Sequence, residues 1–394
     1  MFTRAIGYFL LFICVSAGAT TLNSGSGAAF ESVNPRSEGD EWWDDAWIHR
    51  ALVYIDNHYN NEVLTYFPIS VSVSYRGSMQ PDFDDLRFTD LDGDQLPYWI
   101  EESERSSYAK VWVRVPEIPA AANVYMYYGN PAAASESDIE GYAELCEPFN
   151  DDPTRSGGWS VYRHAGEVSL EGCWDPADGV LYLTRQECNL GAALFADLDM
   201  NRFNGWVLTF DYLVGDGTGA EGFCAMFYKD EAPYAGGTPS CGGGLGFTTA
   251  DGDAIQGYGI EFDAHPGEGD PNRRHAALIE DSTDNHLKTV EDDRVCDGMW
   301  HHVELVNLRG KLTLNLDSDT LIYERIFNTP GGDRSYGGLG FCAATGDLTN
   351  DHVIDNVLLR KLTQPMPTSM VGDEEGPDSM IVEITFGQLK ALYR

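Results

Sequence analysis

The stretch GIEFDAHPGEGDPNRRHAALI, residues 259–279, decides how the second half of the chain is expected to fold. Apolar residues and carboxylates alternate at its start, as in a β-strand, where residues two positions apart face the same side. Glu261 and Asp263 therefore project together, while Ile260 and Phe262 point to the opposite side, into a core. The sequence predicts a strand that carries a pair of carboxylates on one face.

The residues after this strand predict a loop that returns further metal-binding groups to it. A proline and two glycines, among them Gly267, favour a turn, and Asp270 and His275 lead into the next apolar run, HAALI. Three carboxylates and one imidazole can close on a single ion. Oxygen ligands suit Ca²⁺ and the imidazole suits Mn²⁺ or another transition metal, so a binuclear site bridged by Asp263 and Asp270 is chemically sensible.

Outside this stretch, short apolar segments alternate with turn residues almost throughout the chain. The segments are rich in Val, Ile, Tyr and Trp and are bounded by Asn, Asp, Gly and Pro, which is typical of antiparallel strands. They occur at residues 51–56, 68–75, 109–115, 123–129, 205–214, 222–228, 257–264, 301–308 and 311–317. Residues 129–152, rich in alanine, serine and acids, predict a linker between two β domains.

Composition narrows the classes of partner. The 394 residues are 43% hydrophobic, which is enough for two or three domains with cores. The formal net charge is −38, from 63 acidic and 25 basic residues. No basic stretch is long enough to follow a phosphate backbone. Nucleic acid and anionic membranes are therefore poor partners, whereas cations and neutral polar surfaces suit the chain better.

The N-terminus predicts export. The positive charge of Arg4 precedes an apolar run from Ala5 to Val15, and the small residues 17–19 fit a cleavage site. Residues 1–19 are therefore expected to be a secretory signal. No other apolar run approaches the roughly 18 residues of a membrane span. We expect a secreted or surface-exposed chain without a transmembrane segment.

The cysteines predict at least one disulfide. Of the eight cysteines, Cys14 falls within the signal, which leaves seven in the mature chain. In an oxidising compartment some of these are expected to pair, and an odd number leaves at least one outside an intrachain disulfide. Cys224 and Cys241 bracket a connection rich in glycine and proline and are the pair we expect.

Four segments of the first half occur in a recognisable order. They are WWDDAWIHR (42–50), DLRFTDLDGDQLPYWIEE (85–102), AKVWVRVPEI (109–118) and VYMYYGNPAA (124–133). They resemble a secreted bacterial and archaeal domain of unknown function, often found beside lectin-like sandwiches and in some proteins of the biopolymer-transport proton-channel family. The resemblance covers residues 41–138 and implies a β-rich domain, but no chemistry.

Two features of this half have both a functional and a structural interpretation. Four acids have the spacing of an EF-hand-like calcium loop, but Gln95 stands where that loop needs glycine, so a hairpin turn is favoured. Three tryptophans would suit a sugar-stacking platform, but buried anchoring of the first strand is favoured. The acids are Asp90, Asp92, Asp94 and Glu101, and the tryptophans are Trp42, Trp43 and Trp47.

Five motifs of the second half surround the opening stretch. They are GAEGF (219–223), GGGLGF (242–247), GIEFDAHPGEGDPNRRH (259–275), WHHVEL (300–305) and GFCAATG followed by a histidine (340–352). Together they resemble a legume-lectin-type (L-type) lectin domain over residues 147–362. The resemblance implies a concanavalin A-like jelly roll, in which paired transition-metal and calcium ions lie beside a shallow sugar site.

The resemblance implies a set of metal ligands when it is carried over residue by residue. Glu261, Asp263, Asp270 and His275 correspond to the transition-metal ligands. Asp263, Asp270 and the main-chain carbonyl of His265 correspond to the calcium ligands.

The resemblance also implies sugar contacts. Glu221 stands where the family has an aspartate in its sugar-contacting motif, and Gly243 and Gly244 match a glycine-rich loop whose N–H groups donate to a hydroxyl. Gly267 stands near the family's asparagine, which binds both calcium and sugar, and the loop around it is shorter here. These departures predict weak binding of sugar.

Two other functions remain open. Laminarinase-like glycosidases place a nucleophile and a general acid on one strand of the same jelly roll, because retaining hydrolysis needs two carboxyls about 5 Å apart. Here His265 and Pro266 stand where the second glutamate belongs, so the chain is not expected to be an enzyme. The third possibility is a surface scaffold without sugar specificity. Residues 371–394, an acidic linker followed by a mixed apolar and basic tail, would serve such a role.

The sequence thus predicts an all-β chain, with an antiparallel β-sandwich at residues 41–138 followed by a concanavalin A-like jelly-roll sandwich at residues 147–362. The expected function is binding of a glycan or polysaccharide. The expected cofactors are Ca²⁺ and Mn²⁺ or another transition metal, which would shape the site.

Overall fold

The computed structural model describes residues 42–153, 158–164, 174–175, 179–196, 198, 205–228, 234, 237–265, 267, 270–271, 273–326 and 338–376. These residues form four antiparallel sheets, and the one α-helix among them, α1, is a single turn at Ile139–Tyr142. The expected all-β fold class is confirmed. The expected signal at residues 1–19 and the tail beyond residue 376 lie outside the described residues.

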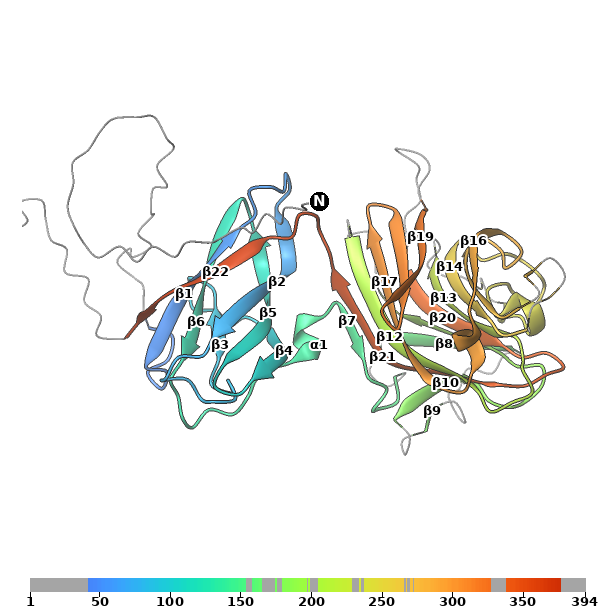
Figure 1. Ribbon diagram of the computed structural model, residues 1–394, viewed down its shortest axis with the longest axis horizontal. Coiled ribbons are helices and arrows are strands. Elements are labelled where there is room, and N and C mark those ends of the chain that lie inside the picture. Colours follow the sequence, from blue (N-terminus) through green and yellow to red (C-terminus); the bar gives the residue numbers. More distant parts are fainter. Residues whose placement is uncertain are drawn as a thin grey trace, which may run out of the picture. The chain divides into compact units, whose positions relative to one another are not determined.

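The described residues include no helix that is long and apolar enough to cross a membrane. The chain instead builds two β-sandwiches, each with its own core (Figure 1).

The first sandwich packs a four-stranded sheet, in the order β22-β1-β6-β3, against a three-stranded sheet, in the order β2-β5-β4. Its strands are β1 (His49–Asp56), β2 (Leu64–Ser74), β3 (Arg87–Thr89), β4 (Tyr98–Glu104), β5 (Tyr108–Ile118), β6 (Ala121–Tyr128) and β22 (Thr368–Glu375). Alternation along β2 shows how the core forms, since Val71 and Val73 are buried while Ser72 and Ser74 face outward.

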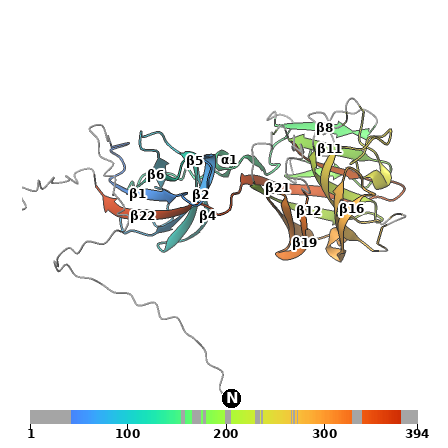
Figure 2. The same cartoon turned by 90° about the horizontal axis from the view of Figure 1, so that it is seen from above.

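Strand β22 corrects the expectation that an acidic linker begins at residue 371. Residues 368–375 instead pair antiparallel with β1, and the two strands lie side by side in both views (Figures 1 and 2). Val371 packs against the core of the first sandwich. Glu374 accepts a hydrogen bond of 2.8 Å from the hydroxyl of Tyr128 on β6. The acids that suggested a linker therefore lie on an edge strand, where charge also discourages pairing with other chains.

The tryptophan cluster anchors the start of the first sandwich. Trp47 is buried, and its indole N–H donates to the carbonyl of Asp85 at 2.7 Å. The indole N–H of Trp42 donates to the carbonyl of Trp47 at 2.7 Å, and Trp43 packs on Trp47 with ring centroids 5.0 Å apart. The structural interpretation of these three residues is therefore confirmed.

The acidic loop of the first sandwich is a turn. Asp90 Oδ1 accepts the N–H groups of Asp92 and Asp94 at 3.0 and 2.9 Å, and Thr89 bridges to Gln95 across the turn. Because the Asp90 carboxylate bonds to the local backbone, the hairpin interpretation is confirmed for this loop.

The second sandwich packs an eight-stranded sheet against a seven-stranded sheet. The larger sheet runs β19-β18-β17-β12-β21-β10-β9, with β7 beside β21, and the smaller runs β16-β15-β14-β13-β20-β11-β8. The larger sheet comprises β7 (Leu145–Glu147), β9 (Trp174–Asp175), β10 (Val180–Thr184), β12 (Gly205–Gly215), β17 (Trp300–Leu308), β18 (Lys311–Leu316), β19 (Asp319–Arg325) and β21 (Asp351–Lys361). The smaller comprises β8 (Trp159–Arg163), β11 (Gly191–Ala196), β13 (Gly222–Tyr228), β14 (Gly257–Asp263), β15 (His275–Glu280), β16 (His286–Glu291) and β20 (Gly338–Ala344).

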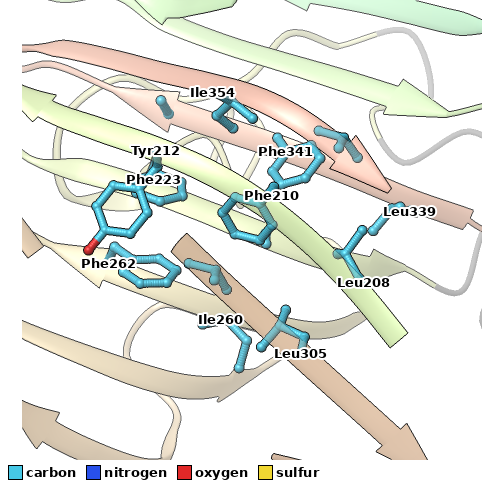
Figure 3. Packing of buried hydrophobic residues seen from close by; sticks show 14 of the residues in the cluster. Leu208, Phe210, Tyr212, Phe223, Ile260, Phe262, Leu305, Leu339, Phe341 and Ile354 are labelled. Atoms are coloured by element: carbon cyan, nitrogen blue, oxygen red, sulfur yellow. The ribbon is translucent and has the colours of Figure 1, made fainter. Parts of the chain in front are cut away.

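Aromatic rings fill the core between these two sheets (Figure 3). Phe223 on β13 and Phe262 on β14 stack with centroids 4.6 Å apart and planes 3° apart. Tyr212 on β12 approaches the Phe262 ring at 4.9 Å from the opposite sheet. Phe210 meets Phe341 in the same way at 5.0 Å. These contacts fix which residues of β13 and β14 face inward.

The other face of the seven-stranded sheet carries a second, smaller core. Cys224, Met226 and Cys342 belong to it, together with residues of the connection between β13 and β14. Cys224 lies directly opposite Cys342, across β13 and β20.

The expected pairing of Cys224 with Cys241 is not found. Both are free thiols in the structure, and Cys241 Sγ lies 4.0 Å from His164 Nε2. Their positions at the two ends of one connection did not predict their pairing, because Cys224 lies on β13 opposite Cys342 of the neighbouring strand β20.

Ending the chain at Pro367 tests the role of β22. This truncation removes the pairing partner of β1 and the packing of Val371, so we expect the first sandwich to lose about 2 kcal/mol or more of stability. For a domain of about 100 residues this corresponds to a melting temperature lower by roughly 8 °C. A chain that ends at Gly376 keeps β22 and is the matched control. Equal melting temperatures for the two truncated chains, measured by calorimetry, would contradict a structural role for β22.

Candidate metal centre

Three neighbouring strands at one edge of the seven-stranded sheet position the predicted metal ligands. The edge runs β16-β15-β14, and Asp263 on β14 pairs with His275 on β15. Glu261 lies two residues before Asp263 and therefore on the same face. Ile260 and Phe262 belong to the core between the two sheets, as expected from the alternation.

Carboxylates and imidazoles gather here in two overlapping groups, in each of which the potential ligand atoms lie within 4.8 Å of one another. The first group is Glu261, His275 and His286, and the second is Asp263, Asp270 and His275. The structure therefore brings together four of the predicted metal ligands. The side chain of His265 is in neither group, and its main-chain carbonyl remains a predicted calcium ligand.

His286, at the start of β16, is the site residue that sequence analysis missed. Its Nε2 lies 3.0 Å from Glu261 Oε2 and 3.7 Å from Asp270 Oδ1. Its ring is T-shaped to that of His275, with centroids 5.4 Å apart. No local spacing rule connects His286 to Glu261, because the two are 25 residues apart and only the pairing of the strands brings them together.

One ring nitrogen of His275 makes no hydrogen bond within the described part of the chain. The residue is fully buried, and its Nδ1 lies 3.3 Å from the carbonyl of Arg273. Its Nε2 is buried and has no hydrogen-bond partner among the residues that the structure describes. A donor bond from Nδ1 to a carbonyl leaves the lone pair of Nε2 free, which is the usual arrangement of a histidine that binds a metal.

Burial and hydrogen bonding shift the pKa values of the carboxyl and imidazole groups in the cluster in different directions. Burial raises the pKa of Glu261, and the hydrogen bond from His286 opposes this shift. The pKa of Asp263 rises to about 8, first through burial and then through the charge of Glu261. The hydrogen bond to Glu261 raises the pKa of His286, whereas burial lowers the pKa of His275. Neighbouring buried carboxylates therefore disfavour one another's charge, and a positive ion would reverse this.

The residues of the cluster fit a divalent cation. Carboxylate oxygens suit Ca²⁺, and imidazole nitrogens suit Mn²⁺, Zn²⁺ or a related transition metal. The free Nε2 of His275 and the raised pKa of Asp263 both indicate groups that a cation would satisfy. When bound, such an ion would supply positive charge directly to the buried carboxylates of Glu261 and Asp263.

The predicted sugar-binding residues lie at the same end of the sheet. Glu221 immediately precedes β13, and burial raises its pKa. A Cβ built on Gly346 would lie 2.4 Å from Glu221 Oε1 and 3.5 Å from the Cα of Gly242, so Gly346 lies close to the Glu221 carboxylate and to Gly242. Gly243 and Gly244 follow in the 3₁₀ turn η3 (Gly242–Gly244). A Cβ on Gly243 would meet nothing within 4 Å, so this side of the turn is open.

The metal cluster and Glu221 are connected through the backbone. The N–H groups of Ala264 and His265 donate to the carbonyl of Glu221 at 2.7 and 3.2 Å. The N–H of His265 also lies 2.7 Å from Asp263 Oδ1. Gly267, the fourth predicted sugar-binding residue, donates its N–H to Asp270 Oδ2 at 2.7 Å. The residues after β14 therefore touch both the predicted metal ligands and the predicted sugar site.

The stability of the metal-free chain should depend on pH through Asp263. Its carboxyl has an ordinary pKa of 3.8 and a pKa of about 8 in the folded chain, so between these values the folded state holds a proton that the unfolded state releases. In the presence of a chelator we expect stability to fall as pH rises from about 4 towards 8, by at least about 1.4 kcal/mol.

The Asp263→Asn variant removes this titration and should flatten the pH dependence of the melting temperature. Asp251→Asn changes an exposed aspartate of the same sandwich and is the control. If the Asp263→Asn variant and the unaltered chain respond identically to pH, the carboxyl of Asp263 is not protonated in the folded, metal-free state.

Comparison with known proteins gives a family match to part of the chain. Residues 82–162 match the domain of unknown function DUF2341. The match begins and ends later than residues 41–138, where the sequence led us to expect such a domain. The expected link with the biopolymer-transport proton-channel family finds no support. A comparison with curated proteins gives no match.

Several solved lectin structures are similar to more than half of the chain. The lumenal domain of VIP36, in a form with Ca²⁺ and mannose, is 16% identical, with 52% of this chain and 83% of that chain covered and a TM-score of 0.40. The seed lectin of Lotus tetragonolobus is 20% identical, with 57% of this chain and 96% of that chain covered and a TM-score of 0.42. The lectin of Bauhinia forficata in complex with GalNAc is 14% identical, with 58% of this chain and 98% of that chain covered and a TM-score of 0.44. The strand pairing by itself shows that the second half of the chain is a β-sandwich of two antiparallel sheets.

Proposed function

We propose that the second sandwich is a carbohydrate-binding module whose sugar site is stabilised by a divalent cation. The observation that carries the proposal is the gathering of three carboxylates and two imidazoles directly behind the backbone that holds Glu221. A buried cluster of this kind is costly without a cation, and its position links the cation to the surface beside Glu221.

The cation would fix the connection after β14. Asp263 is the last residue of β14 and Asp270 lies within the connection, and both belong to one group of potential ligands. An ion that bridges them would hold the residues between them in one conformation. Those residues include Ala264 and His265, whose N–H groups bond to the carbonyl of Glu221. Ion binding would in this way shape one wall of the sugar site.

The sugar would be held by polar groups at the open end of the sheet. The Glu221 carboxylate would accept hydrogen bonds from two hydroxyls, and the N–H of Gly244 would donate to a third. Gly267 has no side chain with which to add a contact. The affinity of one site should therefore be weak, roughly millimolar, and useful when several copies act together.

The burial of the acid pair argues against hydrolysis of a glycan. A glycosidase needs two carboxyls that flank the scissile bond of its substrate. Glu261 is 1% exposed and Asp263 is 6% exposed, and the carboxylate of Glu261 is bonded to His286. A sugar ring has no access to Glu261 in this arrangement. The pair is better suited to an ion than to a glycosidic bond, and this favours binding over catalysis.

With the export signal expected at residues 1–19, we propose that this binding takes place outside the cell. Glycans or polysaccharides of a surface or matrix would then be the partners. The net charge of −38 suits neutral or cationic glycans better than strongly acidic ones.

Removal of divalent cations should destabilise the chain. An ion present at about 100 times its Kd adds about 2.7 kcal/mol of stability, so treatment with EDTA should lower the melting temperature of the second sandwich by roughly 5–10 °C. Returning the metal should restore it. Differential scanning calorimetry and elemental analysis measure the two quantities. A protein that is purified without metal and melts identically with EDTA, Ca²⁺, Mn²⁺ or Zn²⁺ would contradict the proposed cation centre.

Glu221→Gln should weaken glycan binding at least tenfold while the metal content stays unchanged, because the charged acceptor is lost but no metal-ligand candidate is altered. Asp263→Asn should reduce both glycan binding and metal content. Glu117→Gln, an exposed change in the first sandwich, is the control. Glycan arrays probed with the full chain displayed on multivalent beads provide the measurement. Absence of binding to any glycan by the unaltered chain would leave a surface scaffold as the better function.

A further inference from the structure

A second imidazole reaches the cluster from the edge strand. His286 Nε2 lies 3.0 Å from Glu261 Oε2 and 3.7 Å from Asp270 Oδ1. Two adjacent ligand atoms bound to one ion at about 2.0–2.2 Å are roughly 2.8–3.6 Å apart in octahedral and tetrahedral sites. The side chain of His286 is 16% exposed and that of Glu261 is 2% exposed, so both lie within the folded sheet and not on a solvated rim.

The strand register explains how His286 reaches Glu261 across an intervening strand. Glu261 on β14 faces Ala277 on β15, and His286 on β16 faces Ile279, with a register shift between Leu278 and Ile279. Ala277 carries only a methyl group on this face, so no bulky side chain stands between the imidazole and the carboxylate. An alanine at this position thus leaves room for a contact between strands that are not neighbours.

We propose that His286 is a direct metal ligand and that it makes this centre selective for a transition cation of the Zn²⁺ class over Ca²⁺. The proposal rests on the cation centre of the proposed function. Two imidazoles and a carboxylate, from His275, His286 and Glu261, form one of the two groups of potential ligands. Imidazole nitrogen is a good ligand for Zn²⁺, Cu²⁺ and Ni²⁺, whereas Ca²⁺ takes oxygen ligands.

The two groups cannot both use the free nitrogen of His275. Nε2 has one lone pair, and Nδ1 lies beside the carbonyl of Arg273. We assign Nε2 to the ion that His286 binds, because the two rings are then ligands of the same centre. Asp263 and Asp270 remain as oxygen ligands that can bridge to a second, oxygen-rich position. The imidazole pair therefore defines the position that discriminates between cations.

The test counts the imidazoles on the bound ion in the full chain. Pulsed electron paramagnetic resonance of the chain loaded with less than one equivalent of Cu²⁺ reports the number of coordinated imidazoles, and competition with a chelating dye measures affinities for Zn²⁺ and Ca²⁺. His286→Gln removes the imidazole but keeps an N–H donor for Glu261, which protects folding. His58→Gln, an exposed change in the first sandwich, is the matched control.

We expect two imidazoles in the unaltered chain and in His58→Gln, and one in His286→Gln. The Zn²⁺ affinity of His286→Gln should fall at least tenfold, while its Ca²⁺ affinity should change less than twofold. His275→Gln should also leave one imidazole. Melting curves of the chelator-treated variants show whether each one folds.

Other results separate the inference from the proposed function. If the unaltered chain binds a cation with one imidazole, and His286→Gln keeps its Zn²⁺ affinity, His286 only positions Glu261 and the inference is wrong while the cation centre stands. A chain that binds no divalent cation overturns both.

Discussion

The two-sided packing of β14 is the constraint on which the second sandwich depends. On one face, Phe262 stacks on Phe223 and meets Tyr212 from the opposite sheet. On the other face, Glu261 and Asp263 lie in the ion-binding cluster. A slip of one residue in the pairing would exchange the two faces and place both carboxylates among aromatic rings. The aromatic core therefore fixes the face of β14 on which the carboxylates lie.

Close approach of the backbones completes this arrangement. A Cβ at Gly222, which is opposite Asp263, would lie 2.2 Å from the carbonyl of Phe262, so only glycine fits there. A Cβ at Gly259 would lie 2.4 Å from the sulfur of Cys224. These two glycines let β13 and β14 pair tightly under the second core. The tight pairing also fixes the chain where it leaves β13 towards Glu221 and where it leaves β14 towards Ala264.

The parts that could be predicted from the sequence are those set by local alternation. The shared face of Glu261 and Asp263 follows from a period of two, and the return of His275 follows from a single loop. His286 could not be predicted, because its place depends on a register shift in the pairing of β15 with β16. Strand β22 was missed for a similar reason, since its partner β1 lies about 300 residues earlier in the chain and its own acids suggested a linker.

The connection between the cluster and Glu221 limits what an ion can do for a sugar. Among the described residues, only Ala264 and His265 donate a backbone N–H to the carbonyl of Glu221, and both directly follow β14, which carries two of the candidate metal ligands. Gly346, beside the Glu221 carboxylate, and its neighbour Gly242 are held by other elements, because Gly242 donates to the carbonyl of Thr345 and Asn189 donates to the carbonyl of Gly346. An ion can therefore order one wall of the site, while the opposite wall is formed by the β-sheet and its turns. Affinity for sugar should depend on the ion through conformation and not through a shared charge.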